Sequence, residues 1–182
     1  MEATIRPLER SDARRRFSSG SPLHDRYVRE FAWQNQQRHH LAVTYVAVDN
    51  LTHGVLGYVT VSASEVMSDA RGGVAPRSFG GSVPALRIGC LAVDRRAQGH
   101  GLGTALLTHA LKVALAQAVL SGCAAVLVEA TPGAEGYYER FGFTPIAAIE
   151  GASAVRPRPT PMLLPIAQAA AALTAPSRPR SG

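Results

Sequence analysis

The sequence LAVDRRAQGHGLG at residues 91–103 joins an apolar, strand-like stretch to a long amphipathic stretch and decides the fold. Gly99, Gly101 and Gly103 remove side chains from alternate positions, so that successive backbone N–H groups can point into one concavity. The stretch that follows is predicted to be a helix, whose first turn adds unpaired donors and the positive end of a dipole. This pattern predicts a site for a phosphate-bearing ligand.

Two familiar phosphate-binding loops fit these residues poorly. A Walker loop carries Lys and then Ser or Thr after its last glycine, whereas Thr104 follows Gly103 with no lysine before it. A dinucleotide fingerprint has glycines at its first, third and sixth positions, whereas these three glycines alternate strictly. An ordinary strand-to-helix turn is the plainer alternative and stays open on this stretch alone.

The stretch resembles the acetyl-CoA-binding motif of the GNAT family of N-acetyltransferases, which reads Gln or Arg, two residues, Gly, one residue, and Gly or Ala. Gln98, Gly101 and Gly103 match this motif, and Arg96, Gly99 and Gly101 match it in a second register. The resemblance implies acetyl-CoA as the cofactor. The residues that it assigns to the cofactor are Leu91, Ala92 and Val93, along the pantetheine arm, and Arg96, Gln98, Gly99, His100, Gly101, Leu102, Gly103 and Thr104, in and beside the phosphate loop.

A second segment agrees with that family in order and spacing. The apolar residues 124–128 are followed by Glu129 and then by a short helical stretch that holds Tyr138 before a Phe-Gly-Phe sequence. The resemblance implies that Tyr138 is a general acid, because a phenol with a reference pKa of ~10 can protonate a departing thiolate. A purely structural role for Tyr138 stays open. No spacing selects the general base, and Glu129 is the first carboxylate to test.

The residues FSSGSPLHDRY at 17–27 and GYVTVS at 57–62 are similar to acetyltransferase toxins of bacterial toxin–antitoxin operons, a likeness that spans most of residues 4–165. It implies acetylation of the α-amino group of aminoacyl-tRNA, a ribbon-helix-helix antitoxin as partner, and a homodimer. An α-amino group has a reference pKa of ~7.7 to 8.0 and needs no strong base. The alternatives are a small-molecule amine or a protein N-terminus as acceptor, and an acetyl-CoA-binding module without catalysis.

The charge of the chain bears on a nucleic-acid partner. The 182 residues carry a formal net charge of +6, and Lys112 is the only lysine. Arginine binds phosphate with a planar fork. Arginines cluster early in the sequence, at Arg10 and residues 14–16, and the candidates for tRNA phosphates are Arg14, Arg15, Arg16, Arg71, Arg77 and Arg87. A nucleic-acid partner and a merely solvated basic face are both consistent with this pattern.

The remaining composition predicts a cytoplasmic protein without a metal site. Cys90 and Cys123 fall on or near predicted strands and show no metal-ligand spacing, so neither a disulfide nor a zinc site is expected. The N-terminus is charged early, unlike a signal peptide. No apolar run approaches the roughly 18 residues that a membrane span requires.

The order of the elements predicts an α/β protein with the GNAT fold: a central, mixed but mostly antiparallel sheet of about six to seven strands, flanked by about four helices. Expected strands are residues 4–7, 41–48, 55–64, 86–93, 124–130, 144–149 and 162–166, and expected helices are residues 22–38, 101–120 and 134–140. Residues 1–166 are assigned to one acetyltransferase domain and residues 167–182 to a flexible Ala/Pro/Arg-rich tail, which is expected to begin as a short helix near residue 167. The Gly- and Pro-rich residues 65–84 are expected to form a long loop over the substrate.

Overall fold

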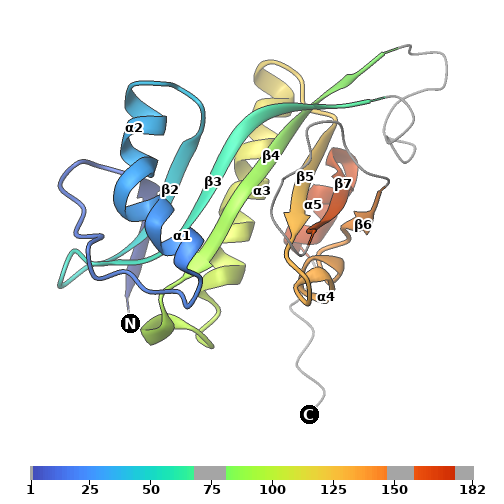
Figure 1. Cartoon of the computed structure of the whole chain (residues 1–182). Coiled ribbons are helices and arrows are strands. Elements are labelled where there is room, and N and C mark those ends of the chain that lie inside the picture. The colour runs from blue at the N-terminus through green and yellow to red at the C-terminus, as the bar shows by residue number, and fades with distance from the viewer. Residues whose placement is uncertain (1, 68–80, 147–157, 175–182) are drawn as a thin grey trace. The chain divides into compact units, whose positions relative to one another are not determined.

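The computed structural model describes residues 2–67, 81–146 and 158–174, and its elements are a mixture of strands and helices (Figure 1). The strands are β1 Ala3–Pro7, β2 Val43–Asp49, β3 Val55–Val66, β4 Val83–Val93, β5 Ala125–Ala130, β6 Thr144–Pro145 and β7 Thr160–Pro165. The helices are α1 Pro22–Arg26, η1 Tyr27–Phe31, α2 Ala32–Gln37, η2 Arg95–Ala97, α3 Leu102–Leu120, α4 Glu135–Glu139 and α5 Ile166–Thr174. The predicted α/β class is confirmed.

The strands form a seven-stranded sheet in the order β1-β2-β3-β4-β5-β7-β6. β1 and β2 pair antiparallel with Ala3 opposite Asp49, and β2 pairs antiparallel with β3. The register of the second pair shifts between Ala47 and Val48, which marks a β-bulge. At the other end of the sheet β7 pairs antiparallel with both β5 and β6.

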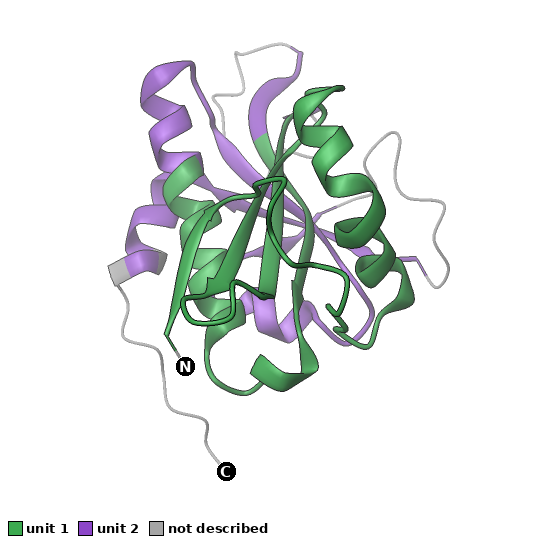
Figure 2. Ribbon diagram, turned by 90° about the vertical axis from the view of Figure 1, so that its left-hand side faces the viewer, with its two compact units in different colours: residues 1–64, 86–113 green, residues 65–85, 114–182 purple. Residues whose placement is uncertain are grey.

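The chain divides into two compact units (Figure 2). Unit 1 consists of residues 1–64 and 86–113, and unit 2 consists of residues 65–85 and 114–182. The long elements β3, β4 and α3 each contribute residues to both units. The phosphate loop predicted from the sequence lies within unit 1, whereas Glu129 and Tyr138 lie within unit 2.

The core of unit 1 is built around Tyr58, which is fully buried on β3. Phe17 meets its ring edge-on at 5.5 Å, and Tyr27 stacks on it at 6.0 Å. Val28 and Ala32 from the helices join the same cluster. The single helix expected over residues 22–38 is interrupted by a π-helical segment, η1, which alters the direction of the side chains that follow it.

The core of unit 2 contains alternating residues of β5 together with the start of β4. Ala125 and Leu127 pack with Val83, Ala85 and Leu163 in one cluster. The backbone N–H of Ala124 donates to the carbonyl of Pro84 at 2.8 Å, which ties the beginning of β5 to the first residues of β4. Unit 2 therefore has apolar packing of its own.

The observed elements differ from the predicted ones mainly at their ends. β4 begins at Val83, three residues before the predicted start. β6 covers Thr144–Pro145, and residues 147–149 of the strand predicted over residues 144–149 lie outside the described residues. The predicted loop at residues 65–84 is shortened at both ends, because β3 continues to Val66 and β4 begins at Val83. Residues 68–80 lie outside the described part of the chain. α5 is the short helix expected near residue 167, and the tail from residue 175 also lies outside the described residues.

One sequence-based expectation about membranes needs correction. α3 spans 19 residues with a mean hydropathy of 1.3, so by length and composition alone it is apolar enough to cross a membrane. A core helix passes the same test, since its inner face is apolar. The buried face of α3 consists of Leu106, Leu107, Ala110, Leu111 and Ala114, whose spacing matches one side of a helix.

Candidate active site

Two glycines give the loop between β4 and α3 its shape. Gly99 has φ +78° and Gly101 has φ +79°, a left-handed conformation that other residues adopt only with strain. A Cβ atom at either position would meet no other atom within 4 Å, so both face open space. Gly103 lies inside the first turn of α3. Of the three alternating glycines, therefore, only Gly99 and Gly101 shape the loop before the helix.

The first turn of α3 is a site for an anion. The N–H group of Ala105 donates to the carbonyl of Gly101 at 3.0 Å and begins the helical ladder. The preceding N–H groups, of Leu102, Gly103 and Thr104, have no partner one turn earlier in the helix, and they lie at the positive end of its dipole. No acidic residue occurs in this turn. A phosphate group fits this combination of open glycines and exposed donors.

The side chains of Gln98 and His100 stabilise the loop from within. The amide nitrogen of Gln98 donates to the carbonyls of Val93 and Ser19, each at 2.9 Å. His100 Nδ1 lies 2.8 Å from the carbonyl of Gln98. These contacts hold the loop between the end of β4 and the segment before α1, and the ligand contacts assigned to Gln98 and His100 stay predictions.

Asp94 is a residue of this site to which the sequence assigned no role. Its carboxylate accepts bonds from the N–H and Nε of Arg96, at 3.0 and 2.8 Å, and from the N–H of Ser18, at 3.0 Å. Burial raises the pKa of Asp94, but the bonds from Arg96 and Ser18 outweigh it and leave that pKa below its usual value. Its position directly after an apolar strand and before two arginines was the signal available in the sequence.

The end of β4 is packed closely against β3. Leu91 and Val93 are half-buried and Ala92 is buried, so the three residues assigned to the pantetheine arm lie along one strand. A Cβ atom on Gly57 would lie 3.2 Å from the carbonyl oxygen of Ala92 and 2.8 Å from Leu106. Gly57 therefore allows β3, β4 and α3 to approach one another, a role that the sequence motif did not reveal.

Side chains of β3 form hydrogen bonds with the backbone of β4 and of α1. The N–H of Cys90 donates to Thr60 Oγ1 at 2.8 Å, and a Cβ atom on Gly89 would lie 3.0 Å from that oxygen. The hydroxyl of Tyr58 donates to the carbonyl of His24 at 2.8 Å. Burial raises the pKa of both Cys90 and Tyr58. Cys90 is therefore a poor thiolate nucleophile and contributes to packing.

Tyr138 and Glu129 occupy defined positions within unit 2. Tyr138 is 7% exposed on α4, and its ring meets those of Tyr137 and Phe143 edge-on at 5.1 and 5.7 Å. The N–H groups of Phe141 and Phe143 both donate to its carbonyl. Glu129 is half-buried near the end of β5, opposite Pro161 of β7. The catalytic roles assigned to Tyr138 and Glu129 stay predictions.

The described residues contain no group of three or more His, Cys, Asp or Glu side chains that could hold a metal ion. Arg71 and Arg77, two of the arginines proposed for phosphate contacts, lie outside the described residues. Of the others, Arg14, Arg15 and Arg16 line one cavity of unit 1 together with Arg10, Arg29 and Arg96, whereas Arg87 on β4 is not among the lining residues.

Residues 5–143 match the model of the acetyltransferase (GNAT) family. A tRNA-acetylating toxin of Mycobacterium tuberculosis (strain ATCC 25618 / H37Rv) is 35% identical over 128 residues, which cover 70% of this chain and 75% of that protein.

Two solved structures share the fold. AtaT complexed with acetyl-methionyl-tRNAfMet matches with a TM-score of 0.81 at 22% identity, over 95% of this chain and 100% of that chain. A mutant AtaT bound to acetyl-CoA and to the C-terminus of the antitoxin AtaR matches with a TM-score of 0.73 at 22% identity, over 95% and 99% of the two chains.

Proposed function

Because the chain belongs to the acetyltransferase (GNAT) family, we propose that it is a toxin that transfers an acetyl group from acetyl-CoA to the α-amino group of an aminoacyl-tRNA. The observation that carries the choice of acceptor is the 35% identity to a tRNA-acetylating toxin. The net charge of +6 is consistent with a polyanionic substrate.

The loop after β4 fits the diphosphate of coenzyme A. The backbone N–H groups at the start of α3 would hold the phosphate oxygens, and the left-handed Gly99 and Gly101 leave room for the phosphates to approach the backbone. The backbone of Leu91 and Val93 would bind the pantetheine arm. When bound, acetyl-CoA supplies a thioester whose carbonyl carbon accepts the amine.

Two protons must move in this reaction, because a C–N bond forms at the amine and a C–S bond breaks. The α-amino group has a reference pKa of ~7.7 to 8.0, so a substantial fraction is neutral near pH 7.5 and a weak base suffices. Glu129 is the carboxylate that we assign to accept the amine proton. Tyr138 is assigned to donate its phenolic proton to the departing sulfur.

The proposal is tested by incubating the purified protein with radiolabelled acetyl-CoA and total tRNA charged with all amino acids. We expect label in the RNA fraction that is released as acetyl-amino acid when the ester bond is hydrolysed by mild alkali. Deacylated tRNA is the matched control, because it has the same phosphates without the amine. Labelling of a free amine or a peptide N-terminus, with none on any aminoacyl-tRNA, would reject the proposed acceptor and favour a different GNAT substrate.

The antitoxin, the dimer and the cytoplasmic location belong to the same proposal. AtaT, which shares this fold, binds an antitoxin in its solved complex, and that likeness supports a search for a small neighbouring gene. We expect the neighbouring gene product to be a ribbon-helix-helix protein that suppresses the growth arrest caused by this chain. Light scattering of the purified chain tests the homodimer, and cell fractionation tests the location.

A further inference from the structure

A cavity of about 710 Å³ in unit 1 is lined mainly by arginines. The loop between β1 and α1 contributes four of them, η1 contributes one, and η2 contributes one. They are Arg10, Arg14, Arg15, Arg16, Arg29 and Arg96. Arg14 is half-buried and the other five are exposed, so their charged ends remain accessible to a ligand from solvent.

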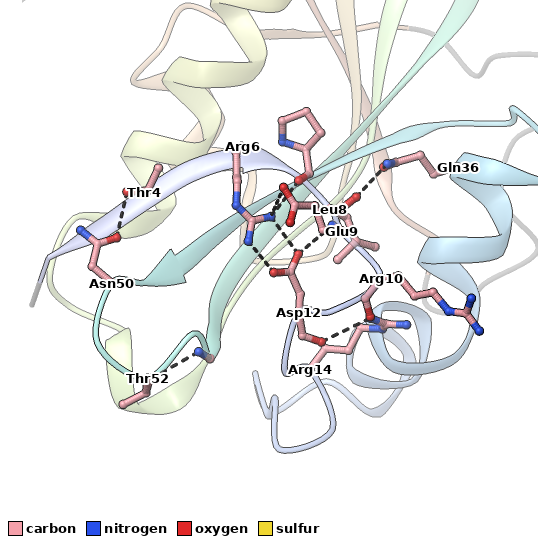
Figure 3. A network of polar contacts seen from close by, with 12 residues as sticks. Thr4, Arg6, Leu8, Glu9, Arg10, Asp12, Arg14, Gln36, Asn50 and Thr52 are labelled. Carbon is pink, nitrogen blue, oxygen red and sulfur yellow. Dashed lines mark hydrogen bonds and ion pairs between the residues drawn. The ribbon is translucent and has the colours of Figure 1, made fainter.

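Asp12 provides the one carboxylate among the lining residues, and it is neutralised by Arg6, which does not line the cavity. Asp12 accepts from Arg6 Nη2 at 2.6 Å and Nη1 at 3.0 Å, and from the N–H of Glu9 at 2.8 Å. The hydrogen bond to Asp12 is the main reason that the pKa of Arg6 is raised. Figure 3 shows the Arg6 and Asp12 side chains facing one another, while the guanidinium of Arg10 points away from that carboxylate.

Most of the cavity's arginines have no acidic partner. Arg14 Nη1 donates only to the carbonyls of Asp12 and Arg10, at 3.3 and 3.4 Å. Arg29 donates to the carbonyl of Phe17 and also interacts electrostatically with Asp25, so it is partly balanced by an acidic residue. Among the described residues no carboxylate forms an ion pair with Arg10, Arg15 or Arg16. Like charges gathered without counterions repel one another, so an anionic ligand would stabilise this cavity.

We propose that this cavity binds the sugar–phosphate backbone of the tRNA, an inference that rests on the proposed function. Guanidinium groups match phosphate oxygens in pairs, and this volume is large enough for more than one phosphate. None of the lining residues is aromatic, so no ring is present on which a base could stack. The cavity therefore recognises phosphates without reading bases.

Its position next to the acetyl-CoA loop supports a substrate contact. Arg96 lines the cavity and is held by Asp94, which also anchors the N–H of Ser18 beside the loop. Backbone phosphates bound here would lie near the start of the phosphate loop, within unit 1. Binding at this cavity would thus bring the RNA close to the acetyl donor without a specific base sequence.

The test compares two double variants that remove equal charge. Arg15→Ala with Arg16→Ala removes two cavity arginines, whereas Arg38→Ala with Arg158→Ala removes two exposed arginines outside the cavity. Binding of fluorescently labelled, uncharged tRNA is measured by anisotropy from about 50 to about 200 mM salt. Uncharged tRNA makes the binding readout independent of acetyl transfer, and KM and kcat for aminoacyl-tRNA are measured separately.

The cavity variant is expected to bind tRNA about tenfold more weakly near 150 mM salt, with a slope of log K against log salt that is shallower by about 2. Its KM should rise with little change in kcat, and the control variant should match the wild type.

Equal behaviour of the two double variants overturns the proposal. So does weaker coenzyme A binding in the cavity variant, by calorimetry, or loss of antitoxin binding with tRNA binding intact. If the wild type binds tRNA through the cavity but acetylates none, the proposed function fails and the cavity assignment stands.

Discussion

The carboxylate of Asp94 accepts a hydrogen bond from the backbone N–H of Ser18 at 3.0 Å, across 76 residues of sequence. The same carboxylate binds the backbone and the guanidinium of Arg96. Arg95 adds a second link, because its N–H donates to the carbonyl of Ser18 at 2.8 Å. The segment before α1 and the entrance of the phosphate loop are thereby fixed to each other.

Replacing Asp94 tests this link. Asp94→Ala leaves the N–H groups of Ser18 and Arg96 without their acceptor, and we expect the free energy of unfolding to fall by about 3 kcal/mol. Affinity for coenzyme A should fall as well, because the loop loses its anchor. Urea unfolding and calorimetry measure the two effects. Asp94→Asn keeps one acceptor oxygen and should lose less stability; an Asp94→Ala variant as stable as the wild type would show that the link is dispensable.

Acid should weaken the same link. The pKa of Asp94 lies below its usual value in the folded protein, so its contribution to stability is present above about pH 4, the unfolded value, and is lost as pH falls through the folded pKa. Burial raises the pKa of Asp25, but hydrogen bonds from Ser19 outweigh it and lower that pKa, so the contribution of Asp25 to stability is also lost as pH falls.

We therefore expect the free energy of unfolding to decrease between about pH 5 and pH 3, and to decrease less steeply in Asp94→Asn, which cannot titrate at this position. Urea titrations at a series of pH values provide the comparison. Parallel pH profiles for the two proteins would mean that Asp94 does not contribute to the acid sensitivity.

The sequence predicted the strands and helices well where a local signal defines them. Alternating apolar residues marked β2 and β3, and glycines marked the turn into α3. The π-helical η1 was missed, because its apolar spacing differs little from that of an α-helix over five residues. The end of β6 at Pro145 was also missed, because the extent of this strand depends on its pairing with β7 rather than on its own residues.

The site residues, like the helices and strands, were predicted where a local sequence signal exists and missed where the role depends on tertiary contacts. Gly99 and Gly101 were found because a left-handed turn requires a specific residue type. Asp94 and Gly57 were not assigned roles, since their importance lies in contacts with Ser18 and with Ala92 that only the folded chain creates. Similarly, the run Arg14 to Arg16 is visible in the sequence, but its convergence with Arg29 and Arg96 on one cavity is a tertiary property.

The phosphate site makes a specific prediction about Gly101. In Gly101→Ala the left-handed backbone is retained at a cost of about 1–2 kcal/mol, and the new methyl group projects into the space expected for a phosphate. We expect coenzyme A to bind at least about tenfold more weakly, a loss of about 1.4 kcal/mol or more by calorimetry.

Gly122→Ala is the matched control for backbone strain. Gly122 has φ +86° and lies two residues after Leu120, the last residue of α3. A Cβ atom on Gly122 would have only an ordinary contact, with Pro84 at 3.9 Å. This variant should lose similar stability while keeping its affinity for coenzyme A. Equal affinities of the two variants would remove Gly101 from the phosphate site.

The assignment of Tyr138 as the general acid is the most direct test of the chemistry. Tyr138→Phe keeps the ring that packs against Tyr137 and Phe143, so we expect stability close to that of the wild type. Without the phenolic proton, turnover should fall by about tenfold or more while affinity for coenzyme A is retained. Tyr137→Phe removes a hydroxyl from the neighbouring ring and serves as the matched control, with turnover near that of the wild type. Steady-state kinetics of all three proteins with aminoacyl-tRNA decide the matter: unchanged turnover in Tyr138→Phe would leave Tyr138 only its structural role within unit 2.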